Sequence, residues 1–336
     1  MRNLLTDISG VSVGHAHDAA SASGVTAILF DPPAVASIDV RGGGPGTRED
    51  ALLKPESTVE AIDGIALSGG SAFGLDAAGG VQAWLAEQGR GLRIREAIIP
   101  IVPGAICFDL LNGGNKAWGR FPPYRDLGYA AACAASSDFA LGSVGAGLGA
   151  TTANFKGGLG SASAQTAGGV TVGALAVVNA VGSVTVGDGP WFWAAPFETA
   201  NEFGGRGLPP AFTQDMLSAR LKGGPAAAFS ENTTLVVVAT DATLTKAQCT
   251  KFAAVAQNGL ARALNPVHTM FDGDIVFGLS TAAAGVPDQA GFHRITVAGA
   301  DAVTRAIVRA LLAAQTTTTP AGSWPSWSDV VAGTVR

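Results

Sequence analysis

Charged side chains are scarce in this sequence. Asp, Glu, Lys and Arg make up 14% of its 336 residues, whereas a typical soluble chain has about a quarter. The net charge is −5, so the chain lacks the excess of Lys and Arg with which nucleic-acid-binding proteins neutralise phosphates. The composition therefore predicts no nucleic-acid partner. A surface with so little charge also indicates that part of it is covered in a homo-oligomer.

Long hydrophobic runs and paired cysteines are missing too. No stretch of 18 apolar residues occurs without glycine or polar breaks, so the sequence predicts no membrane span. The start, MRNLLTDISGVSVGH, lacks the apolar segment and cleavage site of a signal peptide. Cys107, Cys133 and Cys249 are odd in number and lack metal-ligand spacing. This predicts buried thiols, a cytoplasmic location and no metal site.

Nucleotide and serine-hydrolase motifs are also absent. The glycine loop at 42–46 does not follow the GxGxxG pattern, no Gly-Lys-Ser/Thr follows it, and GxSxG does not occur. Hydrophobic residues make up 47% of the chain, which is enough for a large core. The length suits two domains or one large α/β structure.

The hydrophobic pattern mixes strands and helices. Strands are predicted at 25–31, 38–41, 65–67, 97–102, 170–186, 233–240 and 274–280, and helices at 75–85, 127–138, 246–264 and 301–314. The strand at 25–31 is expected to end at a Pro-Pro pair, and the helix at 246 to begin with a capping box of Thr245 and Gln248. Segment 197–229 is interpreted as a surface connection that tolerates a chain break. A layered α/β/β/α sandwich fits this order better than a doubly wound parallel sheet.

Thr233 begins a strongly β-branched strand directly after Asn232. If the chain breaks between these two residues, Thr233 gains a free α-amino group, whose ordinary pKa is near 8. That amine can act as general base toward the threonine's own hydroxyl, which makes the residue a competent nucleophile. The alternative is a threonine that only starts a strand.

Four other polar residues are candidates for chemistry. Asp272 and Asp274 stand two residues apart where the chain enters a strand. Two carboxylates this close raise the pKa of one of them, which suits proton handling. The alternatives are a metal site or an Asx-turn. Asn179 lies within an apolar strand. Its side-chain amide is either a donor to an oxyanion or a core amide that is hydrogen-bonded to backbone. Lys156 is the one charge between 142 and 167, either at the surface or desolvated for catalysis.

Together with four longer motifs, these residues resemble the P1 peptidase family, which includes the D-aminopeptidase/esterase DmpA, β-peptidyl aminopeptidases and nylon-oligomer (6-aminohexanoate-oligomer) hydrolases. The motifs are DISGVSVGHAHD (7–18), RGGGPGTRE (41–49), LSGGSAFGLDAAGGV (67–81) and KGGLGSAS (156–163). The resemblance implies an α/β/β/α sandwich similar to N-terminal nucleophile hydrolases, with the topology of DmpA and the ornithine acetyltransferases. It further implies a single catalytic domain, 1–336, that cleaves itself into subunits 1–232 and 233–336.

By the same resemblance, Thr233 is the nucleophile both for cleavage of the Asn232–Thr233 bond and for turnover. A threonine here, with aspartates at 272 and 274, matches the nylon-hydrolase arm of the family. The implied function is an autoprocessed amidohydrolase of peptides or of ω- or β-amino-acid oligomers. It would need no cofactor, would act on a small amide or peptide, and would assemble as a homo-oligomer of cleaved heterodimers.

The resemblance also assigns roles around the nucleophile. Asn179 matches the family's oxyanion-stabilising asparagine, and Lys156 matches a lysine that orients or protonates near the nucleophile. Asp272 and Asp274 match the pair that hydrogen-bonds the nucleophile's amine and hydroxyl.

The sequence departs from the family at several positions. Phe108 stands where some relatives have a tyrosine, so a hydroxyl donor to the oxyanion is lost. Asp109 is the only acidic residue available there to hold a substrate amine, and Glu231 stands where many relatives have glycine. Phe108, Ser71 and Phe73 are weaker candidates for lining the substrate pocket.

Three other functions stay open from the sequence. One is an aminopeptidase of the DmpA or β-peptidyl type. Another is an acyltransferase like the ornithine acetyltransferases, which share the architecture and self-cleave before a threonine. The last is an unprocessed, non-catalytic homologue with a structural or binding role.

Overall fold

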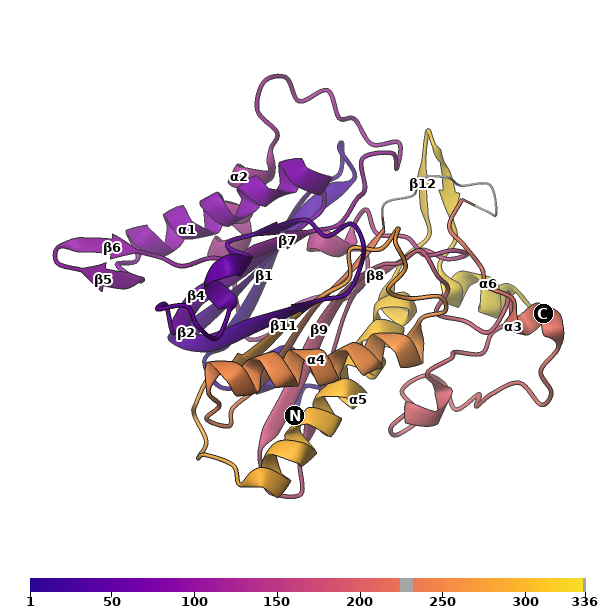
Figure 1. The fold of residues 1–336 in the computed structure, drawn as a ribbon. Helices are drawn as coiled ribbons and strands as arrows, with labels where there is room; N and C mark the ends of the chain where they lie inside the picture. The colour runs from indigo at the N-terminus through magenta and orange to yellow at the C-terminus, as the bar shows by residue number, and fades with distance from the viewer. Residues whose placement is uncertain (224–231, 335–336) are drawn as a thin grey trace.

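The computed structural model of the chain describes residues 1–223 and 232–334 (Figure 1). Its main feature is a large mixed sheet with the strand order β3-β7-β4-β2-β11-β10-β9-β8, in which β1 also pairs with β2. Strands β10 and β11 run parallel, as do β4 and β7, and the other neighbours are antiparallel. The strands of this sheet are β1 (Val11–Asp18), β2 (Ser23–Val40), β3 (Thr47–Arg48), β4 (Ala61–Ser68), β7 (Gly104–Ile106), β8 (Gly158–Gln165), β9 (Thr171–Asn179), β10 (Thr233–Thr240) and β11 (Ile275–Ser280).

Helices and two short hairpins complete the fold. The hairpins are β5 (Leu92–Ile94) with β6 (Ala97–Ile99), and β12 (Thr317–Thr319) with β13 (Gly322–Trp324). The helices are α1 (Ala77–Glu87), α2 (Tyr124–Cys133), α3 (Gln214–Leu217), α4 (Lys246–Ala263), α5 (Gln289–Ala313) and α6 (Trp327–Thr334). Among the described residues, no helix combines the length and apolar character needed to cross a lipid bilayer.

Three hydrophobic cores separate four layers, which confirms the predicted α/β/β/α sandwich. One core lies between α1 and α2 and one face of β2 and β4. A second fills the space between the β1–β2–β4 half of the sheet and the β8–β11 half. The third lies between the outer face of β8–β11 and helices α4 and α5. Figure 1 shows α1 and α2 on one side of the strands and α4 and α5 on the other.

The apolar residues of β10 explain how one strand serves two cores. Successive side chains of a strand point to opposite faces. Leu235 and Val237 therefore enter the core between the two half-sheets, whereas Val236 and Val238 pack toward α4 and α5. A strand that is apolar on both faces must be covered on both, and this uninterrupted run in the sequence points to a buried strand.

Several predicted elements end elsewhere in the structure. The strand predicted to stop at Pro32-Pro33 continues as β2, because the prolines interrupt pairing with β4 only locally, between Leu29 and Ala34. The strand predicted for 170–186 ends at Asn179, since Gly182 then packs against the backbone of Pro266.

Two helices also differ from their predicted ranges, while one signal is confirmed. The helix predicted for 301–314 begins at Gln289, and the helix predicted for 127–138 is Tyr124–Cys133. The capping box before α4 is confirmed, with the Thr245 hydroxyl accepting from the Gln248 amide at 3.2 Å. Cys107 and Cys249 are buried as predicted, but Cys133 is exposed at the end of α2.

Candidate active site

Strand pairing brings Thr233 and Asn179 together. Thr233 is the first residue of β10, and its direct antiparallel partner is Asn179, the last residue of β9. Directly opposed residues in such a pair present their side chains on the same face, with Cβ atoms about 4.5–5.5 Å apart. Both residues are buried, at 3% and 0% exposure. Two of the predicted site residues are therefore cross-strand neighbours held by the sheet itself.

The peptide before Thr233 is bound by a short bridge to the segment before β11. The Asn232 amide donates to the Phe271 carbonyl oxygen at 3.0 Å, and the Gly273 amide donates to the Asn232 carbonyl oxygen at 2.6 Å. The carbonyl of the Asn232–Thr233 bond thus already accepts a short hydrogen bond from a backbone N–H. Such a donor stabilises negative charge that develops on a carbonyl oxygen under attack.

Gly273 also lies directly against the candidate nucleophile. A Cβ atom at this position would come within 2.6 Å of Thr233 Oγ1 and within 2.7 Å of the Gly44 carbonyl oxygen. The Gly44 amide in turn donates to the Asp272 carbonyl oxygen at 2.8 Å. The glycine between the two aspartates is therefore needed because the hydroxyl and the loop around Gly44 leave no room for a side chain.

Asp274 fixes the start of β10. Its Oδ1 accepts from the Thr234 amide at 2.8 Å, and its Oδ2 accepts from the amide of His268 at 3.1 Å. The same Oδ2 lies 2.9 Å from His268 Nδ1. One buried carboxylate therefore ties the residue after Thr233 to the turn at 268.

Asp272 holds the other side of the turn. Its Oδ2 accepts from the amide and the hydroxyl of Thr269, at 2.9 and 2.8 Å, and its Oδ1 accepts from the Val181 amide at 3.3 Å. Burial, and next the charge of Asp274, raises the pKa of Asp272 to about 6. The hydrogen bonds described for the two carboxylates go to these groups and not to Thr233. Their predicted role toward the nucleophile's amine concerns the cut chain and stays a prediction.

The amide of Asn179 is held in one orientation. Its Oδ1 accepts from the Thr151 amide at 3.1 Å and from Lys222 Nζ at 2.9 Å, while its Nδ2 donates to the Phe108 carbonyl oxygen at 3.0 Å. Phe108 thus contacts this part of the site through its backbone carbonyl. The side chain of Asn179 bonds to the Lys222 ammonium as well as to backbone groups, so it is not a core amide bonded to backbone alone. Because Nδ2 carries two hydrogens, one N–H remains for an oxyanion.

Lys156 is buried, so its interpretation as a surface lysine is wrong. Its Nζ donates to three backbone carbonyl oxygens, at 3.1, 2.6 and 3.1 Å, those of Gly147, Ala150 and Gly157. Burial, and next the charge of Lys222, lowers the pKa of Lys156 to about 7.

The three hydrogen bonds of Lys156 hold the turn that presents the Thr151 amide to Asn179. No direct bond from Lys156 to Thr233 is described, and its predicted role near the nucleophile stays untested.

Ser71 and Phe73 lie in a short 3₁₀ turn after β4, where they make other contacts. The Ser71 amide donates to the Cys107 carbonyl oxygen at 3.0 Å, and the Phe73 ring lies 5.7 Å from that of Trp118. No described contact links either residue to Thr233 or Asn179. Their placement in the substrate pocket stays a prediction.

Asp109 serves the same region structurally. Its carboxylate accepts from the Ser23 hydroxyl at 2.6 Å and from the Gly70 amide at 2.8 Å, and it is 3% exposed. Burial raises the pKa of Asp109. Both oxygens are already bonded within the fold, which argues against Asp109 as the group that holds a substrate amine. Glu231, the other departure from the family, lies outside the described residues.

Sequence reasoning missed Lys222, His268 and Thr151 as neighbours of the site. His268 and Thr269 lie four and three residues before Asp272, and that proximity was the available signal. Lys222 lies in a polar connection without any motif, so only the folded chain reveals its contact with Asn179.

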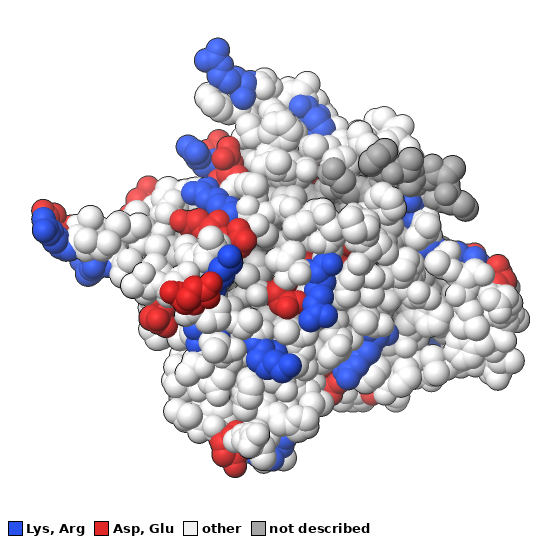
Figure 2. Space-filling view, viewed as in Figure 1, with Lys and Arg blue, Asp and Glu red and all other residues white. Residues whose placement is uncertain are grey.

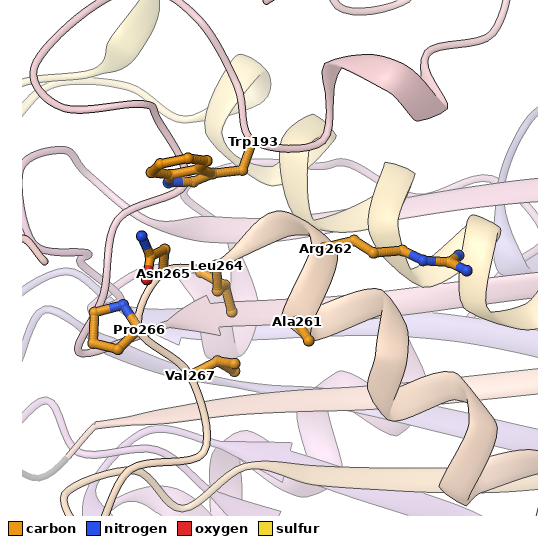
Figure 3. A pocket seen from close by; sticks show the side chains of 7 residues that line it. All are labelled: Trp193, Ala261, Arg262, Leu264, Asn265, Pro266 and Val267. Atoms are coloured by element: carbon orange, nitrogen blue, oxygen red, sulfur yellow. The ribbon is translucent and has the colours of Figure 1, made fainter. Parts of the chain in front are cut away.

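A hollow of about 290 Å³ lies beside the segment that leads to His268 (Figure 3). Figure 3 shows the Trp193 ring above Asn265 and Pro266, with the Arg262 side chain extending away from the hollow. The residues that line the hollow are Trp193, Ala261, Arg262, Leu264, Asn265, Pro266 and Val267. None of the predicted site residues lines this pocket.

Comparisons with known proteins give matches in both sequence and fold. The family model described as Peptidase family S58 matches residues 3–324. An uncharacterised aminopeptidase of Mycobacterium tuberculosis is 42% identical over 98% of both chains. A 6-aminohexanoate-oligomer endohydrolase of Kocuria sp. is 27% identical over 87% of this chain and 78% of its own. Among solved structures, the L-aminopeptidase D-Ala-esterase/amidase of Ochrobactrum anthropi, described as a variant of the Ntn hydrolase fold, superposes with a TM-score of 0.71 at 22% identity, over 98% of this chain and 93% of its own.

Proposed function

The chain belongs to peptidase family S58, and on that premise we propose that it is a self-cleaving aminopeptidase with Thr233 as its N-terminal nucleophile. Family membership makes it a hydrolase of peptide or amide bonds with the N-terminal nucleophile fold. It also confirms the resemblance on which the sequence analysis relied. The identity of the nucleophile, the cleavage site and the preference for free amino ends are the parts proposed here.

The arrangement around the Asn232–Thr233 bond carries this proposal. The Asn232 carbonyl oxygen accepts the Gly273 N–H at 2.6 Å, and Gly273 lies against Thr233 Oγ1. In self-cleavage, Oγ1 attacks the Asn232 carbonyl carbon, the C–N bond breaks, and the hydroxyl proton moves to the Thr233 nitrogen. Water then hydrolyses the ester, leaving a carboxylate on Asn232. The products are 1–232 and 233–336.

In turnover, the freed α-amine of Thr233 takes the proton of its own hydroxyl, and Oγ1 attacks the substrate carbonyl. The remaining N–H of Asn179 donates to the oxyanion, and a donor of this kind contributes about 3 kcal/mol to the transition state. The proton passes to the leaving amine, and water releases the acyl group. Every step uses groups of the protein and water.

The relatives favour aminopeptidase activity over the oligomer hydrolysis that the sequence suggested first. Relatives that are 42% identical are named aminopeptidases, whereas the 6-aminohexanoate-oligomer endohydrolases are 26–27% identical. The threonine and the Asp272–Asp274 pair still favour the endohydrolase as a second candidate. The two differ in whether the substrate must carry a free amine.

A substrate panel separates these candidates. L-alanyl and β-alanyl p-nitroanilides are compared with their N-acetyl derivatives, and a 6-aminohexanoate trimer with its N-acetylated form. The proposal predicts hydrolysis of the free-amine anilides and loss of at least 90% of activity on acetylation. Hydrolysis of the acetylated trimer at the rate of the free trimer would assign the endohydrolase instead. Thr233→Ala serves as the background control.

We also propose a homo-oligomer of cleaved heterodimers in the cytoplasm. The described face in Figure 2 carries few, scattered charges of both signs. The β5–β6 hairpin exposes Leu92, Ile94 and Ile99, with Ile94 at 54%. Light scattering on the purified protein measures the assembly directly.

A further inference from the structure

A second lysine, absent from the sequence-based site, reaches the candidate oxyanion donor. Lys222 lies before the described start of β10, and its backbone amide donates to the Val181 carbonyl oxygen at 2.9 Å. Its Nζ lies 2.9 Å from Asn179 Oδ1 and 3.4 Å from the Thr151 carbonyl oxygen. The chain is thus pinned at Val181 while the ammonium points at the amide of Asn179.

This contact decides which way the Asn179 amide faces. With Oδ1 held by the Lys222 ammonium and the Thr151 amide, the NH₂ group must point to the opposite side, where it meets the Phe108 carbonyl oxygen. A flipped amide would place NH₂ against two donors. A cation on Oδ1 also draws electron density from the amide, which strengthens its N–H groups as donors.

We propose that Lys222 is a positioning residue for oxyanion stabilisation, because it orients and polarises the Asn179 amide. This proposal deepens the proposed function and rests on the role given there to Asn179. The contact itself belongs to the structure and can be tested without enzyme activity.

The charges around Lys222 set the pH range in which it acts. Burial lowers the pKa of Lys222 to about 8, and the nearby carboxylates of Asp109 and Asp272 partly offset this effect. The neighbouring Cys107 thiol is neutral in this range, because burial raises its pKa. Lys156 is a second cation nearby, and the two ammonium groups repel each other, since the charge of Lys222 lowers the pKa of Lys156. The ammonium of Lys222 is therefore the main form at neutral pH and is lost as the pH rises through about 8. The Thr233 amine has the opposite effect on the pH dependence of activity, because it must be deprotonated to act as the base.

Kinetics of three variants test the proposal in protein that has cut itself. Lys222→Met removes the charge at similar volume, Lys222→Arg keeps it, and Lys251→Met changes an exposed lysine of α4 as the matched control. Loss of a charged hydrogen bond predicts that Lys222→Met lowers kcat about 10- to 100-fold with KM within about twofold. Lys222→Arg restores most of kcat and moves the alkaline loss of activity to higher pH. A Lys222→Met enzyme with unchanged kcat and pH profile, or with only KM raised, overturns the proposal.

A second measurement covers the case in which Lys222→Met does not mature. In the uncut Thr233→Ala protein, the side-chain NH₂ resonances of Asn179 are followed by NMR between pH 6 and 10. They should shift with a midpoint near pH 8, and Lys222→Met should abolish the shift. If the resonances do not shift with pH, the contact between Lys222 and Asn179 is refuted. If the shift is present but the wild-type protein hydrolyses no amide, only the proposed function is refuted.

Discussion

Replacing Gly273 by alanine should slow self-cleavage by about 100-fold while leaving the protein folded. The new Cβ would lie 2.6 Å from Thr233 Oγ1 and 2.7 Å from the Gly44 carbonyl oxygen. Ordinary contact begins at 3.4 Å, so the hydroxyl must retreat by about 0.8 Å. A misplacement of about 1 Å costs on the order of 100-fold in rate.

The substitution acts by steric contact, on the Thr233 hydroxyl and on the Gly44 backbone, and not through backbone strain. Gly273 does not have a positive φ, so alanine fits the backbone conformation. Overpacking costs about 1–3 kcal/mol, which lies within the 5–15 kcal/mol stability of an ordinary protein. Gly285→Ala is the matched control, because a Cβ there meets nothing within 4 Å.

The assay follows the uncut fraction over time after cell-free translation, by denaturing electrophoresis and mass spectrometry. Wild type and Gly285→Ala should mature at the same rate, and Gly273→Ala should remain largely uncut in that time. Circular dichroism confirms that all three are folded. If Gly273→Ala matures as fast as the control, the contact between Gly273 and the hydroxyl has no part in cleavage.

Three further predictions follow from the same contacts. Asn179→Ala should lower kcat of matured enzyme by about 100- to 1,000-fold with little change in KM, as expected for loss of one oxyanion donor; steady-state kinetics measure this, and an unchanged kcat contradicts it. Because the folded-state pKa of Asp272 is raised from 3.8 to about 6, its contribution to stability is full below pH 3.8 and lost as pH rises through 6; urea unfolding of uncut Thr233→Ala protein should show this decline, which Asp272→Asn should remove. Lys156→Met should lower the free energy of unfolding by about 3 kcal/mol, because three buried carbonyl oxygens lose their donor; a loss below about 0.5 kcal/mol would show that the ammonium is not holding that turn.

The layers of this fold follow closely from the sequence. The apolar run in β10 and the capping box before α4 act locally, through strand geometry and helix-end hydrogen bonding. Both therefore appear in the sequence and in the structure. The prediction that the strand ends at the Pro-Pro pair was wrong, because a proline removes one ladder hydrogen bond without ending an extended strand.

The site was only partly predictable for a different reason. The Asp272–Asp274 pair and its glycine form a contiguous motif, and Asn179 stands out as a polar residue in an apolar strand. Lys222 reaches Asn179 across 43 positions of sequence, and nothing local marks it. Its role depends on the path of the chain, which periodicity does not encode.

The central claim is that the chain cuts itself before Thr233, and intact mass tests it most directly. Freshly purified protein should yield two polypeptides of about 23 and about 10 kDa, in proportion to their lengths, that join at Asn232–Thr233. The Thr233→Ala variant should give a single chain of 33.5 kDa. A wild-type chain that stays at 33.5 kDa on incubation would contradict the N-terminal-threonine mechanism, and cleavage of the variant at the same bond would contradict the role of Thr233.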